Sequence, residues 1–266
     1  MKFVMNNTSF GLVCLILLTV QNCTMIKINV SEKRNSSPQK IEMGKGVTLT
    51  TWGAIRVNKS HFFPSSFQLK TENEIIYIDP VGINTTEKGD YILITHSHPD
   101  HFSLEDIEKI LKPETEIICS QGVKGKLKKV DNKVQVVKPG DSLQLNGFTL
   151  EATAAYNTKS VFLWIKAHPK SKENVGFILT LSNGLKIYHA GDTDFIPEMR
   201  KISNIDLALL PIGGDNLTMN EQEAAQIVNE IQPTKVFPMH FEIKEKEIIK
   251  QFKNLVKEPI EVIEIE

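Results

Sequence analysis

Residues 95–101 hold three histidines and one aspartate (His96, His98, Asp100 and His101), although the whole chain of 266 residues has only seven histidines. This segment directly follows an apolar run, residues 91–94, which is typical of a buried strand. The end of a buried strand is a rigid support, and a loop that leaves it can turn several side chains toward one point. Neutral imidazoles and carboxylates are the ligands that suit zinc, manganese and iron. The segment therefore predicts a transition-metal site.

Four other segments complete a pattern with this one. They are residues 75–80, which end in Asp79-Pro80, residues 188–193 with Gly191-Asp192-Thr193, residues 207–214, and residues 237–240, which end in His240. The spacing His-x-His-x-Asp-His and the order of these segments resemble the metallo-β-lactamase fold family over about residues 45–266. The branch that is most similar includes ascorbate-6-phosphate lactonase-like proteins and, more distantly, the phospholipase D that cleaves N-acyl phosphatidylethanolamines.

The resemblance implies a fold class and a set of metal ligands. The fold is α/β, an αββα sandwich of two mixed β-sheets flanked by helices. In this family the first two histidines bind one metal ion, and the aspartate, the third histidine and a later histidine bind a second. Carried over, the first metal takes His96 and His98, the second takes Asp100, His101 and His240, and Asp192 bridges them. The implied cofactors are two divalent ions, zinc as the first choice and manganese as the second.

The third ligand of the first metal is left open by the sequence. Family members supply a histidine from a loop between the two motifs, but here Asn157 stands at the matching place. Either His168 swings in as the ligand or the Asn157 amide oxygen contacts the metal or its water. His189 is a candidate donor to a metal-bound carboxylate, with a satisfied strand-end histidine as the alternative. His61 is a candidate on the substrate side.

The implied activity is hydrolysis by a metal-bound hydroxide, with Asp100 and Asp192 as catalytic carboxylates and a phosphodiester or a lactone as substrate. A glutamate in place of His98 would have indicated the di-iron redox branch of the fold. The alternative function is a non-catalytic metal- or ligand-binding protein on the same fold. The formal net charge of −1 gives no indication of a nucleic-acid partner, so we expect a small-molecule or lipid-like substrate.

The N-terminus predicts export. An apolar run over residues 10–20 is too short to span a bilayer and fits a signal peptide over residues 1–22. Cys23 then resembles a lipoprotein cleavage site, so we expect a lipid anchor at Cys23 and a periplasmic or cell-surface protein held at a membrane. Residues 23–44 are predicted to be a flexible tether. Cys119 lies in a predicted strand and is expected to be a buried, inert thiol.

Several elements are expected to position these residues. A helix is predicted over residues 103–112, with Ser103 at its start, and a hairpin turn at Asn183-Gly184. A second capping box is predicted at Thr218 and Glu221, before a helix whose apolar residues recur at helical spacing. Further expectations are a strand over residues 161–165, Trp52 and Trp164 in the core, Asp194 as the cap of a helix over residues 195–201, and hydrogen bonds from Asp79 to the metal loop.

Overall fold

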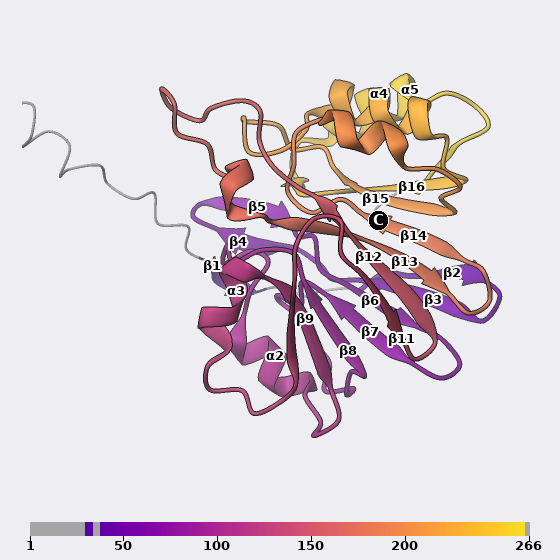
Figure 1. Cartoon of the computed structure of the whole chain (residues 1–266). Coiled ribbons are helices and arrows are strands. Elements are labelled where there is room, and N and C mark those ends of the chain that lie inside the picture. The colour runs from indigo at the N-terminus through magenta and orange to yellow at the C-terminus, as the bar shows by residue number, and fades with distance from the viewer. Residues whose placement is uncertain (1–29, 34–37, 264–266) are drawn as a thin grey trace, which may run out of the picture.

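The computed structural model describes residues 30–33 and 38–263. Two seven-stranded sheets pack face to face, with helices on the outer side of each (Figure 1). The fold is therefore the predicted αββα sandwich. The signal peptide and the Cys23 anchor lie outside the described residues and stay predictions. Within the described residues, no helix combines the length and the apolarity needed to cross a bilayer.

The first large sheet is mixed. Its strands, in spatial order, are β10 (Val134–Val137), β9 (Glu116–Ser120), β8 (Tyr91–Ile94), β7 (Ile75–Ile78), β6 (Phe67–Lys70), β3 (Val47–Thr51) and β2 (Lys40–Gly44). The strands from β10 to β7 run parallel, and those from β7 to β2 run antiparallel. Its outer face is covered by α2 (Leu104–Ile110) and α3 (Gln121–Lys124), which is followed by the short 3-10 helix η1 (Gly125–Leu127).

The second large sheet is also divided into an antiparallel half and a parallel half. Its strands, in spatial order, are β11 (Ser142–Leu145), β12 (Phe148–Ala154), β13 (Val175–Leu181), β14 (Lys186–His189), β15 (Leu207–Pro211), β16 (Lys235–Met239) and β18 (Glu261–Val262). It is antiparallel from β11 to β14 and parallel from β14 to β18. Its outer helices are α4 (Glu221–Ile231) and α5 (Lys246–Leu255), and η2 (Lys170–Lys172) and η3 (Pro197–Lys201) are short 3-10 turns.

A third, four-stranded sheet lies beside these two. It consists of β1 (Val30–Lys33), β4 (Ile55–Val57), β5 (Ser60–Phe63) and β17 (Phe241–Glu242). The predicted tether over residues 23–44 is therefore wrong in part, because β1 and β2 both pair with strands of the domain. In β2, Ile41 and Met43 alternate with exposed residues and pack against the core, a period of two that a strand at a sheet edge requires.

The core is apolar on both sides of the first sheet. Between the two large sheets, Leu69, Phe177 and Leu209 are fully buried, and Ile227 of α4 belongs to the same cluster from the outer side of the second sheet. Cys119 of β9 faces the other side of the first sheet, in a cluster with α2, and is a buried free thiol as predicted. This burial raises the pKa of the Cys119 thiol to about 12.

Some predicted boundaries are confirmed and others are wrong. Ser103 caps α2, because its side chain accepts a hydrogen bond from the backbone of Asp106, and β13 and β14 form the hairpin at Asn183-Gly184. The second capping box belongs to Asn220 and Glu223, two residues later than predicted. The helix starts late because the preceding backbone forms a turn with residue 214 and bonds to residue 193.

Three expectations about the segment between β12 and η3 are wrong. Residues 161–165 form a turn with one isolated bridge between Phe162 and Ile165 rather than a strand. Trp52 is buried as expected, but Trp164 is 80% exposed. Asp194 caps no helix, since η3 starts at Pro197 and the Asp194 carboxylate instead accepts hydrogen bonds from the backbone of residues 158 and 159.

Candidate metal centre

Six of the predicted metal ligands follow strands at the same edge of the sandwich. His96, His98, Asp100 and His101 lie on the loop after β8, Asp192 follows β14, and His240 follows β16. Each of these strands belongs to the parallel half of its sheet, and the carboxyl ends of parallel strands meet at one edge. Residues that are more than a hundred positions apart in the sequence are therefore brought together.

The first group consists of three histidines. One ring nitrogen each from His96, His98 and His168 lies within 4.8 Å of the others. The Nε2 atom of His168 is 3.0 Å from Nδ1 of His98, and the ring centroids of His96 and His168 are 4.8 Å apart. The structure thus places His168, and not Asn157, beside the two histidines of the loop.

Asn157 lies behind His168 and holds it. The Asn157 Oδ1 atom accepts hydrogen bonds from the His168 backbone N–H at 2.8 Å and from its ring Nδ1 at 2.9 Å. The carbonyl of Leu217 lies 3.1 Å from the same ring nitrogen, so both neighbours are acceptors and Nδ1 must carry the proton. The Asn157 amide nitrogen donates to Asp194 and to Leu217, which fixes its orientation. The His168 Nε2 atom consequently carries a lone pair, and this atom faces the group.

The second group consists of two carboxylates and two imidazoles. One ligand atom each from Asp100, His101, Asp192 and His240 lies within 4.8 Å of the others, and all four residues are buried. The His240 Nε2 atom is 2.9 Å from Asp192 Oδ2 and 3.4 Å from Asp100 Oδ2. The His101 Nε2 atom is 3.2 Å from Asp192 Oδ1.

Asp192 is the residue that faces both groups. Besides its contacts with His101 and His240, its Oδ2 atom lies 3.8 Å from Nε2 of His96 and 3.5 Å from Nε2 of His168. A carboxylate in this position is shared between the two sets of donors. This is the arrangement that the bridging role requires.

Asp79 orients the second group through three hydrogen bonds. Its carboxylate accepts hydrogen bonds from the Thr95 backbone at 2.7 Å, from the Thr95 hydroxyl at 2.6 Å and from His101 Nδ1 at 2.7 Å. Because Nδ1 of His101 donates to this carboxylate, its Nε2 atom presents a lone pair to the group. The predicted bonds from Asp79 to the metal loop are confirmed.

The two groups differ in their electrostatics. Burial lowers the pKa of His96 well below its ordinary value, lowers that of His98, and lowers the pKa of His168 to about 4. Burial also lowers the pKa of His240, but the carboxylates of Asp192 and Asp100 outweigh it and raise this pKa to about 9. The first group is thus neutral, which is the ligand form of imidazole, whereas the carboxylates of the second group favour positive charge beside them and also raise the pKa of His101.

Several atoms at the centre are buried without a hydrogen-bond partner among the described residues. They are Nε2 of His96, Nε2 of His101, Oδ1 of Asp100, Oδ1 of Asp192 and Nδ1 of His240. An unpaired buried polar atom costs about 1–3 kcal/mol, so a cluster of them needs compensation. All but one of these atoms are nitrogen or oxygen donors whose lone pairs converge on the centre. A divalent metal ion accepts such lone pairs. The residues present therefore fit the metal ions that the resemblance implies.

Comparison with known proteins decides the family. Residues 61–240 match the family described as the Beta-lactamase superfamily domain. A UPF0173 metal-dependent hydrolase of Thermoplasma acidophilum is 32% identical over 189 residues, which are 70% of this chain and 77% of that protein. The chain belongs to the metallo-β-lactamase superfamily. Within the superfamily it groups with the metal-dependent hydrolases.

Solved structures of this superfamily agree with the fold. One from Parabacteroides distasonis, assigned as a metal-dependent hydrolase, is 30% identical and has a TM-score of 0.68 over 85% of this chain and 97% of its own. A metallo-β-lactamase fold protein of Bacillus subtilis has a TM-score of 0.63 over 82% of this chain and 96% of its own. At 14% identity, this second likeness concerns the fold alone.

Two further residues that the sequence analysis singled out, His189 and His61, lie outside the metal centre. Both ring nitrogens of His189 are satisfied, since one donates to the Ser65 carbonyl at 3.0 Å and the other accepts from the Gly191 backbone at 3.1 Å. His189 is thus a satisfied strand-end histidine, the alternative reading. His61 also lies apart from the metal centre. Neighbouring side chains on a strand face opposite sides, and in β5 it is the next residue, Phe62, that contacts the site.

The sequence did not single out Phe62 or Lys126. The Phe62 ring packs edge-on against the His240 ring, with centroids 4.5 Å apart. The Lys126 ammonium donates to the Ser97 carbonyl in the metal loop and lies 5.1 Å from the centroid of Phe102. A single aromatic and a single lysine carry no motif, so only their place in the fold reveals them.

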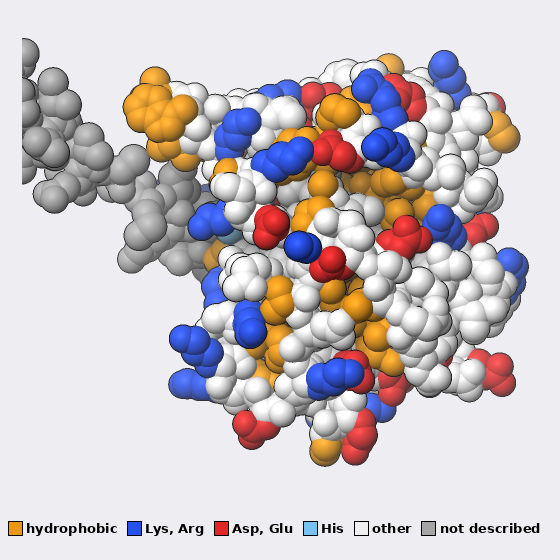
Figure 2. All heavy atoms as spheres, viewed as in Figure 1, with side chains coloured by type: hydrophobic (Ala, Val, Ile, Leu, Met, Phe, Trp, Pro, Cys, Tyr) orange, Lys and Arg blue, Asp and Glu red, His pale blue; other side chains and the backbone are white. Residues whose placement is uncertain are grey.

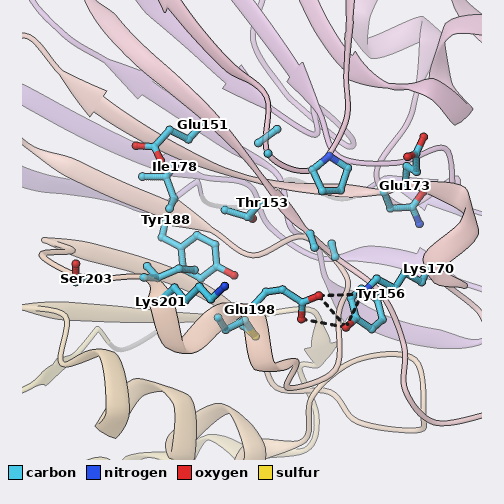
Figure 3. Close-up of a pocket in the computed structure, with 18 of the residues that line it drawn as sticks. Glu151, Thr153, Tyr156, Lys170, Glu173, Ile178, Tyr188, Glu198, Lys201 and Ser203 are labelled. Carbon is cyan, nitrogen blue, oxygen red and sulfur yellow. Dashed lines mark hydrogen bonds and ion pairs between the residues drawn. The ribbon is translucent and has the colours of Figure 1, made fainter.

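A cavity of about 580 Å³ lies apart from the metal centre (Figure 3). It is lined by strands β12 to β14 and by η3, with Thr153, Tyr188 and Glu198 among its residues. None of the residues of the two metal groups lines it. The cavity is therefore a feature of the outer face of the second sheet and not the mouth of the metal site.

Proposed function

We propose that this protein is a hydrolase that uses two divalent metal ions, zinc or manganese, held at the edge of the sandwich. His96, His98 and His168 would hold one ion, and Asp100, His101 and His240 the other, with Asp192 shared. The observation that supports this most directly is the position of the Asp192 carboxylate, 3.5 Å from Nε2 of His168 and 2.9 Å from Nε2 of His240. A pair of divalent ions supplies a nucleophilic water at neutral pH and polarises the group under attack.

The protein itself supplies orientation around that site. Asn157 and Asp79 each accept the Nδ1 proton of one histidine and so direct its Nε2 atom inward. Burial keeps the histidines of the first group neutral and ready to donate a lone pair. No serine or cysteine nucleophile is required, and the cysteine of β9 faces away from the site in the helix-covered layer.

The positive charge of Lys126 beside the metal loop favours an anionic substrate. Of the two substrate classes considered, the phosphodiester is the anionic one. The Lys126 ammonium lies close enough to His98 to contribute to the lowering of its pKa. Lys126 is exposed, and α3 and η1 carry it to the side of the metal loop. A cation there stabilises the negative charge of a phosphodiester and gives nothing comparable to a neutral lactone.

Activity on two substrate types tests this proposal. The full chain, loaded with zinc or with manganese, is assayed with a chromogenic phosphodiester and with a neutral lactone. Asp192→Asn keeps the size of the side chain but removes the charge that faces both groups, so we expect hydrolysis to fall by more than about 100-fold. Asp131→Asn, an exposed carboxylate before β10, is the matched control and should leave the rate unchanged.

The same assay separates the substrate classes and the non-catalytic alternative. Lys126→Gln should raise the KM for the phosphodiester several-fold and leave lactone hydrolysis unchanged, whereas the exposed Lys124→Gln on α3 should affect neither. A metal-loaded protein that binds both ions but turns over neither substrate class would instead support a metal- or ligand-binding protein on this fold.

A further inference from the structure

The exposed apolar side chains of this protein are concentrated at one point. Among the described residues, five large hydrophobic side chains are exposed, and four of them are consecutive: Phe162 (64%), Leu163 (66%), Trp164 (80%) and Ile165 (38%). Figure 2 shows a hydrophobic group projecting at the upper left, where Figure 1 places the loop after β12. We call residues 162–165 the apolar tip. Such a contiguous exposed group marks an interaction surface.

The apolar tip is a closed turn and not an extended chain. The backbone N–H of Val161 donates to the Ile165 carbonyl at 2.8 Å, and the Ile165 N–H donates to the Phe162 carbonyl at 2.8 Å. Leu163 has a φ of 48°, a left-handed conformation that is unfavourable for a residue other than glycine. Backbone groups that bond to each other within the turn can leave water at a lower cost.

The first leg of the loop is fastened to the domain. The Asp194 carboxylate accepts hydrogen bonds from the backbone N–H of Thr158 at 2.7 Å and of Lys159 at 2.9 Å. The Asn157 backbone N–H donates to the His168 carbonyl at 2.8 Å and closes the base between the two legs. The start of the loop is therefore fixed beside the metal site.

The second leg is fastened by three residues that Figure 3 shows together. The Lys170 ammonium lies 2.9 Å from a Glu198 carboxylate oxygen, and the Tyr156 hydroxyl donates to the same carboxylate at 3.0 Å. The base is thus held on both sides, and the apolar tip projects from a fixed support. Little entropy remains to be lost when such a tip binds a surface.

Basic residues flank the apolar tip in the sequence. Between Thr158 and Glu173 the sequence has four lysines and one glutamate, and the lysines are Lys159, Lys166, Lys170 and Lys172. Lys159 and Lys170 have acidic partners within the domain. For Lys166 and Lys172 no ion pair is found among the described residues. A net positive charge beside an aromatic and aliphatic tip is the combination that binds anionic membranes.

We propose that the apolar tip docks into the interface of an anionic lipid bilayer. Phe162, Leu163 and Trp164 would enter the boundary between headgroups and acyl chains, where tryptophan is favoured, and the lysines would contact anionic headgroups. A second copy of this chain is a poorer partner, because it would bring a second set of lysines against the first. A tip of four residues is also much smaller than a standard protein interface, which has roughly 20–30 residues on each side.

Docking would bring the metal site close to the bilayer. Ile165 precedes His168 by three residues, which span at most about 11 Å of chain. The first metal group, which contains His168, would then lie close to the lipid headgroups. The docking proposal does not depend on hydrolysis, and its test below uses no activity.

The two tryptophans of the chain provide the test. Trp52 is 3% exposed and Trp164 is 80% exposed, so a change in fluorescence on docking reports on Trp164. The full chain is mixed with phosphatidylcholine vesicles that contain about 30% phosphatidylglycerol, with and without brominated acyl chains. We expect a blue shift of the emission and quenching by the brominated lipid, both weaker at high salt.

Variants separate the apolar tip from other modes of attachment. Phe162→Ser/Leu163→Ser keeps the tryptophan and should lower vesicle partitioning or Trp164 quenching by about 10-fold or more. Leu255→Ser, the other exposed large hydrophobic residue, is the matched control and should change neither. Vesicle binding through the N-terminus with Trp164 unquenched would overturn the proposal. So would an emission shift that follows protein concentration without lipid, which would indicate self-association.

Discussion

The Asn157 Oδ1 atom lies 2.9 Å from Nδ1 of His168, and this contact resolves which of the two residues stands in the first metal group. Asn157 holds the ring, and the ring presents Nε2 to His98 at 3.0 Å. We infer that Asn157, where the family resemblance led us to expect a histidine, supports a histidine that comes from later in the sequence.

Metal titration of two variants tests these roles. His168→Ala removes a donor of the first group, so we expect the stoichiometry to fall from two equivalents to about one. Asn157→Ala removes only the acceptor of the Nδ1 proton, so two equivalents should still bind at saturation, with affinity at one site lowered about 10- to 100-fold. The measurement is elemental analysis together with chelator competition. Full stoichiometry in His168→Ala and a loss in Asn157→Ala would assign the ligand to Asn157 instead.

Asp79→Asn tests the support of the second group. The amide keeps one acceptor oxygen, but it cannot accept hydrogen bonds from the Thr95 backbone, the Thr95 hydroxyl and His101 at once. Asparagine tolerates the positive φ of 46° at this position, so the backbone should not change. We expect affinity for the ion of the second group to fall about 10- to 100-fold by chelator competition. Asp131→Asn serves as the control, and equal affinities in both variants would disprove the orienting role.

Gly213→Ala tests the close packing behind His240. A Cβ atom at Gly213 would lie 2.2 Å from the backbone carbonyl oxygen of His240, whereas a Cβ at Gly125 meets open space. Overpacking of this kind costs about 1–3 kcal/mol, which corresponds to a Tm lower by about 3–10 °C. Thermal unfolding should show this loss in Gly213→Ala and no comparable loss in Gly125→Ala. An unchanged Tm in both would show that the strand ends can separate freely.

The thiol of Cys119 should be unreactive in the folded protein. Its pKa is raised above the ordinary value to about 12, so at pH 8 the thiolate fraction is only about 10⁻⁴, and it rises only as the pH approaches that value. Burial blocks the reagent as well. Mass spectrometry of the Cys119 peptide after iodoacetamide treatment should show no alkylation in the native protein and complete alkylation in guanidinium. Rapid native labelling would mean that the helix-covered layer opens readily.

The local motifs determined the fold family and most of the site. The loop from His96 to His101 is predictable because its donors are adjacent in sequence and follow a recognisable buried strand. The hairpin at Asn183-Gly184 and the cap at Ser103 are predictable for the same reason, since turn and cap chemistry depends on a few neighbouring residues.

Only the tertiary structure decided the position of His168 and the nature of the loop before it. Residues 161–165 have the composition of a strand, but no strand in the described part of the chain pairs with them, and Trp164 is exposed. Asp194 has the spacing of a helix cap, but its carboxylate is already taken by the loop backbone. A sequence records which residues are chemically able to interact. Which partner each one reaches depends on where the strand ends converge, and that is set by the register of two sheets.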